Sequence, residues 1–305
     1  MNTVPFVTVD VFTTERFAGN QLAVIPDARG LSDTEMQAIA TEFGYSEVTF
    51  VLPPTDPANT ARVRIFTPTT EVPFAGHPNV GTAFVLGQQQ EIFGKKPDSN
   101  LRFEEKAGLV EVVLRHQDGI VTGARIVAPQ ALAIGPAIEV ATIAACASLG
   151  PEALNGQNHS PVRISVGLPF AVAEVNDVET LSKARPNVSA FDEANACYPL
   201  EEDSFSLFLY TRTRERPWQI RARMFAPLDN VIEDPATGSA SAALGAYLVS
   251  LLPDADADVE LVIEQGADMG RRSLITIGVS KKDGAVREVA IAGDCVTAMR
   301  GSIEL

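Results

Sequence analysis

The chain is poor in the residues on which disulfide-bonded proteins and zinc proteins depend. Its three cysteines, Cys146, Cys197 and Cys295, lie far apart and form no Cys-x-x-Cys pair. The sequence therefore predicts neither a disulfide framework nor a zinc site, and favours buried, reduced thiols. The three histidines, at positions 77, 116 and 159, lack the spacing of metal ligands. A metal-dependent hydrolase is therefore a weak hypothesis.

Basic residues and long apolar runs are also scarce. The chain has 24 Lys and Arg against 39 Asp and Glu, a formal net charge of -15. Nucleic-acid affinity comes largely from basic side chains that neutralise phosphates, so we expect no nucleic-acid partner. The longest apolar helical stretch, Ser239 to Leu252, is too short to cross a bilayer, and the first residues lack the pattern of a signal peptide. We expect a cytoplasmic protein with no membrane partner.

The chain contains an internal repeat. The sequence Arg62 to Pro68, RVRIFTP, returns as RARMFAP at Arg221 to Pro227, an offset of 159 from Phe66 to Phe225. A glycine-containing turn and a small, apolar segment follow each copy, and Gly76 and Gly238 are related by an offset of 162. With 305 residues, the chain is long enough for two domains. We expect an N-terminal domain at 1–118, completed by a last strand at about 296–305, and a C-terminal domain at 119–295.

Local signals define the beginning of the first domain. Ser32 to Glu35 form a capping box, an apolar helical pattern follows, and Gly44 supplies a left-handed stop. The next segment, Tyr45 to Leu52, is rich in β-branched and aromatic residues and is predicted to be a strand. Glu47 is then expected at a helix-to-strand corner.

Two segments, His77 to Leu86 and Ser239 to Leu252, are apolar or small on every face, which predicts two central helices, each wrapped by sheet. Pro78 suits the first turn of a helix. Helix starts carry free amide donors and partial positive charge, so two facing starts would bind a carboxylate substrate without Lys or Arg. The alternative is that both are ordinary buried helix caps.

Titratable residues accompany both helix starts: His77 at the first and the Glu233-Asp234 pair at the second, with Glu47 as a third element. Burial of a carboxylate beside another raises its pKa towards neutrality, as general acid-base catalysis requires, and Glu47 is the natural candidate. Taken singly, Glu47 could be a surface carboxylate, His77 a residue held by a turn, Asp234 a helix cap and Glu233 a solvated side chain.

Four segments together resemble one known family. They are Gly19 to Val24, Ser46-Glu47 with Phe50, the Ala-Gly-His-Pro at 75–78, and the Glu-Asp-Pro-Ala-Thr-Gly-Ser-Ala at 233–240. This set resembles the PhzF-like isomerases and epimerases of phenazine biosynthesis over essentially the whole chain. The resemblance implies an α/β (α+β) protein with the diaminopimelate epimerase-like fold. Each of its two similar domains would be a curved, mostly antiparallel sheet around a central helix, with the active site in the cleft between the domains.

The resemblance also implies a chemistry. Diaminopimelate epimerase and proline racemase use one cysteine at each helix start, and neither start has one here. The implied catalytic residues are Glu47 as proton shuttle with His77 and Asp234. The implied substrate-binding residues are Gly76, Gly238, Ser239, Thr237, Ser46 and Asn20. No cofactor and no metal are implied, and a homodimer is expected. The substrate would be a small carboxylate-bearing molecule, with trans-2,3-dihydro-3-hydroxyanthranilate as the candidate.

The chain also departs from the family pattern. Val48 replaces a common Thr, and Gln21 replaces a common Pro, so substrate contacts near Glu47 could differ. The alternative function is a non-catalytic small-carboxylate-binding or regulatory protein on the same fold.

Overall fold

The structure is a computed structural model that describes residues 3–200, 203–213 and 215–305. Its contacts divide the chain into two compact units. Unit 1 contains the residues up to Val127 together with Ala292–Leu305, and unit 2 is Ala128–Ile291. Unit 1 extends beyond the predicted boundary at residue 118, because β8 (Ile120–Val127) pairs antiparallel with β7 (Gly108–Gln117).

Unit 1 is a sheet that closes on itself around one helix. Antiparallel pairs join β1 (Thr3–Val11) to β2 (Asn20–Ile25), β3 (Glu47–Leu52) to β4 (Ala61–Phe66), and β6 (Asn100–Glu105) to β7. Parallel pairs join β2 to β3 and β4 to β6, and the short β5 (Glu71–Val72) flanks β4. The last strand, β17 (Ala285–Glu304), pairs with both β1 and β8 and so completes the circuit.

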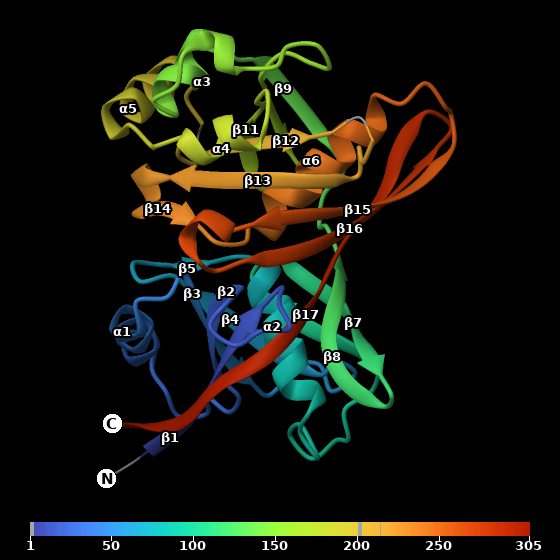
Figure 1. The fold of residues 1–305 in the computed structure, drawn as a ribbon. Coiled ribbons are helices and arrows are strands. Elements are labelled where there is room, and N and C mark those ends of the chain that lie inside the picture. Colours follow the sequence, from blue (N-terminus) through green and yellow to red (C-terminus); the bar gives the residue numbers. More distant parts are fainter. Residues whose placement is uncertain (1–2, 201–202, 214) are drawn as a thin grey trace. The chain divides into compact units, whose positions relative to one another are not determined.

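Helix α2 (Gly76–Gly87) occupies the interior of unit 1, where it contacts β1, β2, β3, β7 and β8. Figure 1 shows it among these strands. Every residue from Gly76 to Leu86 is buried, as the apolar composition on all faces predicts. Helix α1 (Asp33–Phe43) has the predicted capping box at Ser32 and ends at Gly44, which has a left-handed φ of 62°. It packs Met36, Ile39 and Ala40 on the outer side of the sheet.

Unit 2 repeats this strand order. Antiparallel pairs join β9 (Ala133–Ala137) to β10 (Val162–Ser165), β10 to β11 (Pro169–Glu174), β12 (Leu207–Arg212) to β13 (Gln219–Ala226), and β15 (Ala257–Gln265) to β16 (Ser273–Lys282). Parallel pairs join β11 to β12 and β13 to β15, and β14 (Val231–Asp234) flanks β13. The parallel and antiparallel pairs from β10 to β16 match those from β1 to β7, so the repeat seen in the sequence is a repeat of topology.

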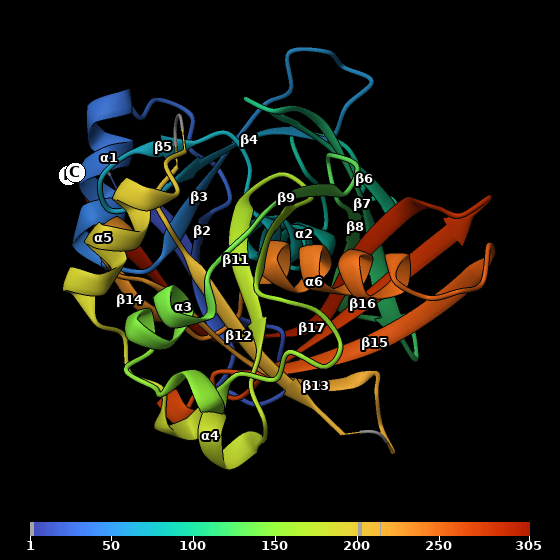
Figure 2. The same ribbon diagram turned by 90° about the horizontal axis from the view of Figure 1, so that it is seen from above.

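Helix α6 (Gly238–Ser250) is the counterpart of α2 and contacts β10, β11, β15 and β16. Figure 2 shows α6 on one side of β11 and β12, with α3 (Val140–Cys146), α4 (Val178–Lys183) and α5 (Val188–Cys197) on the other. Short 3-10 turns lie at Pro151–Ala153, Pro227–Asp229 and Ala267–Met269. The mixed α/β architecture, with a central helix in each unit, confirms the predicted fold class.

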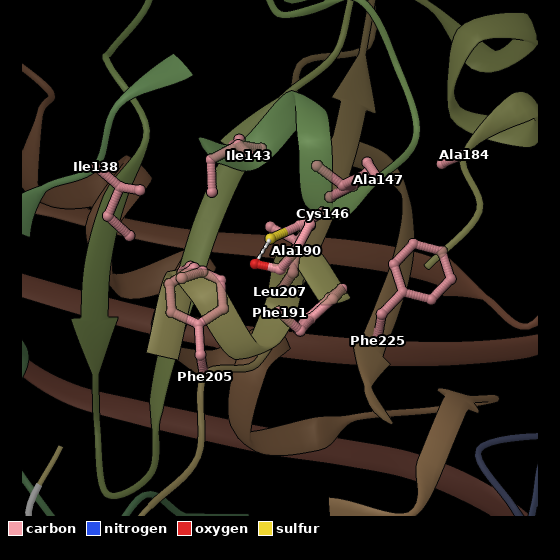
Figure 3. Packing of buried hydrophobic residues seen from close by; sticks show 14 of the residues in the cluster. Ile138, Ile143, Cys146, Ala147, Ala184, Ala190, Phe191, Phe205, Leu207 and Phe225 are labelled. Atoms are coloured by element: carbon pink, nitrogen blue, oxygen red, sulfur yellow. Dashed lines mark hydrogen bonds between the residues drawn. The ribbon is translucent and has the colours of Figure 1, made fainter. Parts of the chain in front are cut away.

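The outer helices of unit 2 cover a second core. Phe191, Phe205 and Phe225 are fully or almost fully buried in it (Figure 3). Cys146 lies in this cluster and donates from Sγ to the carbonyl of Ala190 at 3.5 Å, and burial raises its pKa to about 12. Burial also raises the pKa of Cys295. Cys197 is exposed at the end of α5, which corrects the prediction that all three thiols are buried.

The last strand is longer than predicted. The chain from Ala285 to Glu304 forms one continuous strand, whereas the sequence analysis places the last strand at about 296–305, and Gly293 within it is a point of close packing. A Cβ on Gly293 would lie 2.2 Å from a ring carbon of Phe12. Among the described residues, no helix is long and apolar enough to cross a membrane.

Candidate active site

Glu47 lies at the helix-to-strand corner that the sequence predicts and is the first residue of β3, which begins two residues after the predicted start at Tyr45. The left-handed Gly44 ends α1, and Ser46, which is partly buried, leads the chain into the strand. The parallel pairing of β2 with β3 sets Glu47 opposite Leu22. The side chain of Glu47 is 18% exposed. It is therefore largely withdrawn from water and still open to a small molecule.

His77 is the second residue of α2 and lies against Glu47. Its Nε2 is 3.3 Å from Oε2 of Glu47, and its Nδ1 is 3.4 Å from Nδ2 of Asn20. Burial lowers the pKa of His77 to about 3, although a hydrogen bond with the backbone of Gln21 opposes the shift. The imidazole is therefore neutral at physiological pH.

The start of α2 forms the rest of this cluster. Its N-cap residue, Ala75, has no side chain that could cap the helix, and the described residues place no side-chain cap hydrogen bond there. Gly76 is the buried first residue of the helix. Asn79 donates from Nδ2 to the carbonyl of Ala75 at 3.1 Å. The first amide groups of α2 therefore remain donors next to the Glu47–His77 pair.

Unit 2 has a matching cluster at the start of α6. Oδ2 of Asp234 accepts a hydrogen bond from the Thr237 hydroxyl at 2.6 Å, and both residues are 8% exposed. Gly238 is the first, buried residue of the helix, and Ser239 after it is partly buried. Gln265 fixes this turn: its Oε1 accepts from the Thr237 amide at 3.0 Å, and its Nε2 donates to the Asp234 carbonyl at 2.7 Å.

Gln265 was not among the residues that the sequence indicated. It is the last residue of β15 and follows the buried Leu261 and Ile263 on the same face of the strand. A polar residue at an inward position of an alternating strand is the signal that could have found it.

The repeated Arg-x-Arg motif has a structural role in each unit. Arg64 donates from Nε and Nη2 to the two carboxylate oxygens of Glu71 at 2.7 and 2.8 Å, and its guanidinium lies 5.1 Å from the centre of the Phe66 ring. These contacts tie β4 to β5, the strand that precedes the start of α2. The second arginine of the motif therefore binds the carboxylate of the neighbouring strand while its guanidinium lies against the phenylalanine of the motif.

Unit 2 repeats this arrangement. Arg223 donates to both oxygens of Glu233 at 2.8 Å and lies 4.9 Å from the centre of the Phe225 ring. Its remaining terminal nitrogen donates to the carbonyls of Leu181 and Ala184, at the end of α4. Glu233 is thus the partner of Arg223 and not a solvated side chain. The bidentate pair holds β14, and with it the neighbouring Asp234.

The structure thus brings together Glu47, His77 and Asn20 in unit 1, and Asp234, Thr237 and Gly238 in unit 2. Gly76, Ser46 and Ser239 are adjacent to these residues in the chain. The prediction that both clusters serve one active site stays a prediction. Within the described part of the chain, no group of three or more His, Cys, Asp or Glu is placed to hold a metal ion.

Comparison with known proteins agrees with the family that the sequence motifs indicate. Residues 9–301 match the family model of the phenazine biosynthesis-like proteins, PhzC-PhzF. An uncharacterised isomerase of Mesorhizobium japonicum is 36% identical over 308 aligned residues that cover 99% of each chain. The trans-2,3-dihydro-3-hydroxyanthranilate isomerase of Pseudomonas chlororaphis is 33% identical, and the match covers 98% of this chain and 99% of that protein.

A solved structure shows the same fold over the whole length. The crystal structure of a PhzF-family phenazine biosynthesis protein from Bacillus anthracis superposes with a TM-score of 0.88 at 25% identity, and covers 100% of both chains. The sequence motifs, the repeated fold and these full-length matches agree. The chain therefore belongs to the phenazine biosynthesis-like family and is an isomerase of that family.

Proposed function

We propose that the protein moves a proton between two carbons of a small carboxylate-bearing substrate, with Glu47 as the acid-base group and without a cofactor. The observation that carries this proposal is the pair of Glu47 and the neutral His77. It joins a partly exposed carboxylate to a buried, neutral imidazole, whose Nε2 lies 3.3 Å from Oε2 of the carboxylate. A group that takes up a proton and returns it must be both reachable and shielded from bulk water.

The reaction proposed for Glu47 is balanced in protons and electrons. The carboxylate removes a proton from a saturated carbon, and the electron pair of that C–H bond forms a new double bond. The neighbouring double bond shifts, and its far carbon takes the proton back from the carboxylic acid of Glu47. Nothing is oxidised or reduced overall. His77 keeps its proton and orients the carboxylate of Glu47 through the contact at Nε2.

The two helix starts supply the proposed binding groups for a substrate carboxylate. The amides of α2 near Gly76, and those of α6 near Gly238 and Ser239, are donors at positive helix ends. Asp234, whose second oxygen is held by Thr237, is proposed to contact a polar group of the substrate. A relative named trans-2,3-dihydro-3-hydroxyanthranilate isomerase is 33% identical over nearly the full length, so this compound is the first substrate to test. A homodimer and a cytoplasmic location stay predictions.

The test compares the wild-type protein, Glu47→Gln and the control Glu42→Gln with this substrate in heavy water. Glu42 is exposed on α1, and its replacement tests whether loss of any glutamate matters. We expect turnover with carbon-bound deuterium in the wild type and the control, and none in Glu47→Gln, because an amide cannot carry the proton. Activity of Glu47→Gln at the wild-type rate would refute the proposed role.

A second outcome separates the alternative function from the enzyme. If the wild type showed no exchange of deuterium into the compound, yet small carboxylates raised the thermal stability of both the wild type and Glu47→Gln, the protein would be a carboxylate-binding protein. That result would overturn the proton-transfer proposal.

A further inference from the structure

Glu105 is a buried carboxyl group next to the candidate active site, and the proposed reaction does not use it. It is the last residue of β6 and follows Leu101 and Phe103, which are 1% and 0% exposed, on the inward face of that strand. Both carboxylate oxygens are buried, and within the part of the chain that the structure describes neither has a hydrogen-bond partner. A buried carboxylate without partners is costly, so the site requires an explanation.

The polar neighbour of this carboxyl is the side chain of Asn79, in the first turn of α2. Nδ2 of Asn79 already donates to the carbonyl of Ala75, while its Oδ1 is buried and, among the described residues, has no donor. An ionised Glu105 can accept from the second N–H of the Asn79 amide, and this hydrogen bond lowers the pKa of Glu105, but a carboxylate has no donor for Oδ1 of Asn79. A proton on Glu105 supplies the missing donor for Oδ1 of Asn79.

The internal repeat supports the same conclusion. Arg62 is the parallel partner of Glu104 in β4 and β6, and Arg221 is that of Glu264 in β13 and β15. Glu105 and Gln265 are therefore equivalent positions, and the preceding inward residues Leu101 and Phe103 correspond to Leu261 and Ile263. In unit 2, the amide of Gln265 has one donor and one acceptor group and uses both to fix the turn before α6. A neutral carboxylic acid has the same pair of groups in nearly the same shape.

We propose that Glu105 is a neutral carboxylic acid that positions the turn at the start of α2, through Asn79, as Gln265 positions the turn at the start of α6. This turn carries Gly76 and His77. Glu105 is a positioning residue, because it acts on the Glu47–His77 pair only through the backbone of α2.

The electrostatics of unit 1 favour the neutral form. Burial raises the pKa of Glu105 to about 8, and the Asn79 amide reduces that shift only in part. The charged side chains of the neighbouring elements have partners of their own: Lys106 and Arg64 both bind Glu71 of β5. Glu104, on the other face of β6, accepts from the amides of Thr55 and Asp56. His77 on α2 is neutral and contacts Glu47.

The proposal predicts how stability depends on pH. The folded protein keeps the proton of Glu105 up to about pH 8, whereas an unfolded chain loses it near the ordinary value of 4.5. Stability from this group is therefore fully present below pH 4.5 and falls as the pH rises to about 8. Over this range the unfolding equilibrium constant of the wild type rises up to about tenfold per pH unit relative to a variant that cannot ionise.

The experiment measures denaturant unfolding from pH 6 to pH 9 for the wild type, Glu105→Gln and Gln265→Glu. Glu105→Gln keeps a donor for Asn79 and carries no charge, so its stability should exceed that of the wild type by a margin that grows up to about pH 8. Gln265→Glu is the mirror variant in unit 2, and it should lose stability as the pH rises. Parallel pH curves for the wild type and Glu105→Gln would overturn the proposal, and so would a Gln265→Glu variant as stable as the wild type at every pH.

A direct measurement does not depend on any variant being well folded. The side-chain carboxyl carbon of Glu105 in the wild type, followed by NMR, should titrate near pH 8, and a midpoint near 4.5 would overturn the proposal. The catalytic readout rests on the proposed function: kcat of the wild type should fall above about pH 8 and that of Glu105→Gln should not. If the protein did not turn over the tested substrate, the stability and NMR results would still decide the state of Glu105.

Discussion

The buried pair of Arg223 and Glu233 leads to the most specific stability prediction. Arg223 is 4% exposed, and its guanidinium makes two hydrogen bonds to the Glu233 carboxylate and further bonds to the carbonyls of Leu181 and Ala184. Replacement of Arg223 by Ala leaves the Glu233 carboxylate without its bidentate donor, whereas the carbonyls of Leu181 and Ala184 still accept from the Ala184 amide and from Nη1 of Arg185. Removal of one partner from a buried ion pair costs about 3–5 kcal/mol.

The equivalent pair in unit 1 provides an internal comparison. Arg64 makes the same bidentate contact with Glu71, but its side chain is 20% exposed. After Arg64→Ala the Glu71 carboxylate still has Lys106 as a partner, with Nζ at 2.7 Å, so we expect a smaller loss, on the order of 1–3 kcal/mol. Arg287, which is 58% exposed and lies 3.9 Å from Asp283, is the surface control, and its replacement by Ala should change stability by less than about 0.5 kcal/mol.

The assay is equilibrium unfolding in urea for the three single variants, together with a double-mutant cycle of Arg223→Ala and Glu233→Ala. We expect the order Arg223, Arg64, Arg287 in lost stability, and a coupling free energy between Arg223 and Glu233. The two units could unfold separately, so fluorescence and circular dichroism should be followed together. A loss in Arg223→Ala no larger than in Arg287→Ala would refute the reasoning from burial.

Three further predictions concern single side chains. Burial lowers the pKa of His77 to about 3, so the folded protein resists protonation of this imidazole. The free energy of unfolding should therefore fall as the pH drops from 6.5 towards 3, and His77→Gln should reduce that loss in an acid-unfolding experiment. The same acid transition in the wild type and His77→Gln would contradict this prediction. Cys197 is exposed, whereas Cys146 and Cys295 are buried. A thiol reagent should therefore modify one cysteine in the native protein and all three only after unfolding, which mass spectrometry would show. Rapid modification of Cys146 in the native protein would contradict its burial in the core of unit 2. Asp234→Asn keeps an acceptor for the Thr237 hydroxyl, so it should fold normally and lose activity at least tenfold if the carboxylate contacts the substrate; full activity in steady-state kinetics would remove Asp234 from the proposed site.

Much of the local structure could be predicted from the sequence. The capping box at Ser32 and the left-handed stop at Gly44 depend on neighbours within four residues. The strand that follows was predicted from Tyr45 and begins at Glu47. Helix α5, Val188–Cys197, was missed, since its apolar pattern is weak and its burial comes from packing on β12 and α3.

The candidate site was predicted less completely than the fold. The motifs indicated Glu47, His77 and Asp234, because a titratable residue next to a buried helix start is conspicuous in the sequence. Glu233 was grouped with them, although it is the partner of an arginine ten residues earlier in the chain. Gln265 and Glu105 were missed altogether. Each ends a strand far along the chain from the turn that it contacts, and local sequence patterns do not report such contacts.

The sequence by itself determined the repeat, the two buried helices and the chemical types at their starts, because these depend on composition, on short-range spacing and on a comparison of the chain with itself. Only the tertiary structure decided which side chains meet. The contact of Glu47 with His77 joins residues 30 positions apart, and it is set by the parallel pairing of β2 with β3 and the enclosure of α2. Strand register fixes such distances, and register follows from how the whole sheet closes around its helix rather than from any one segment.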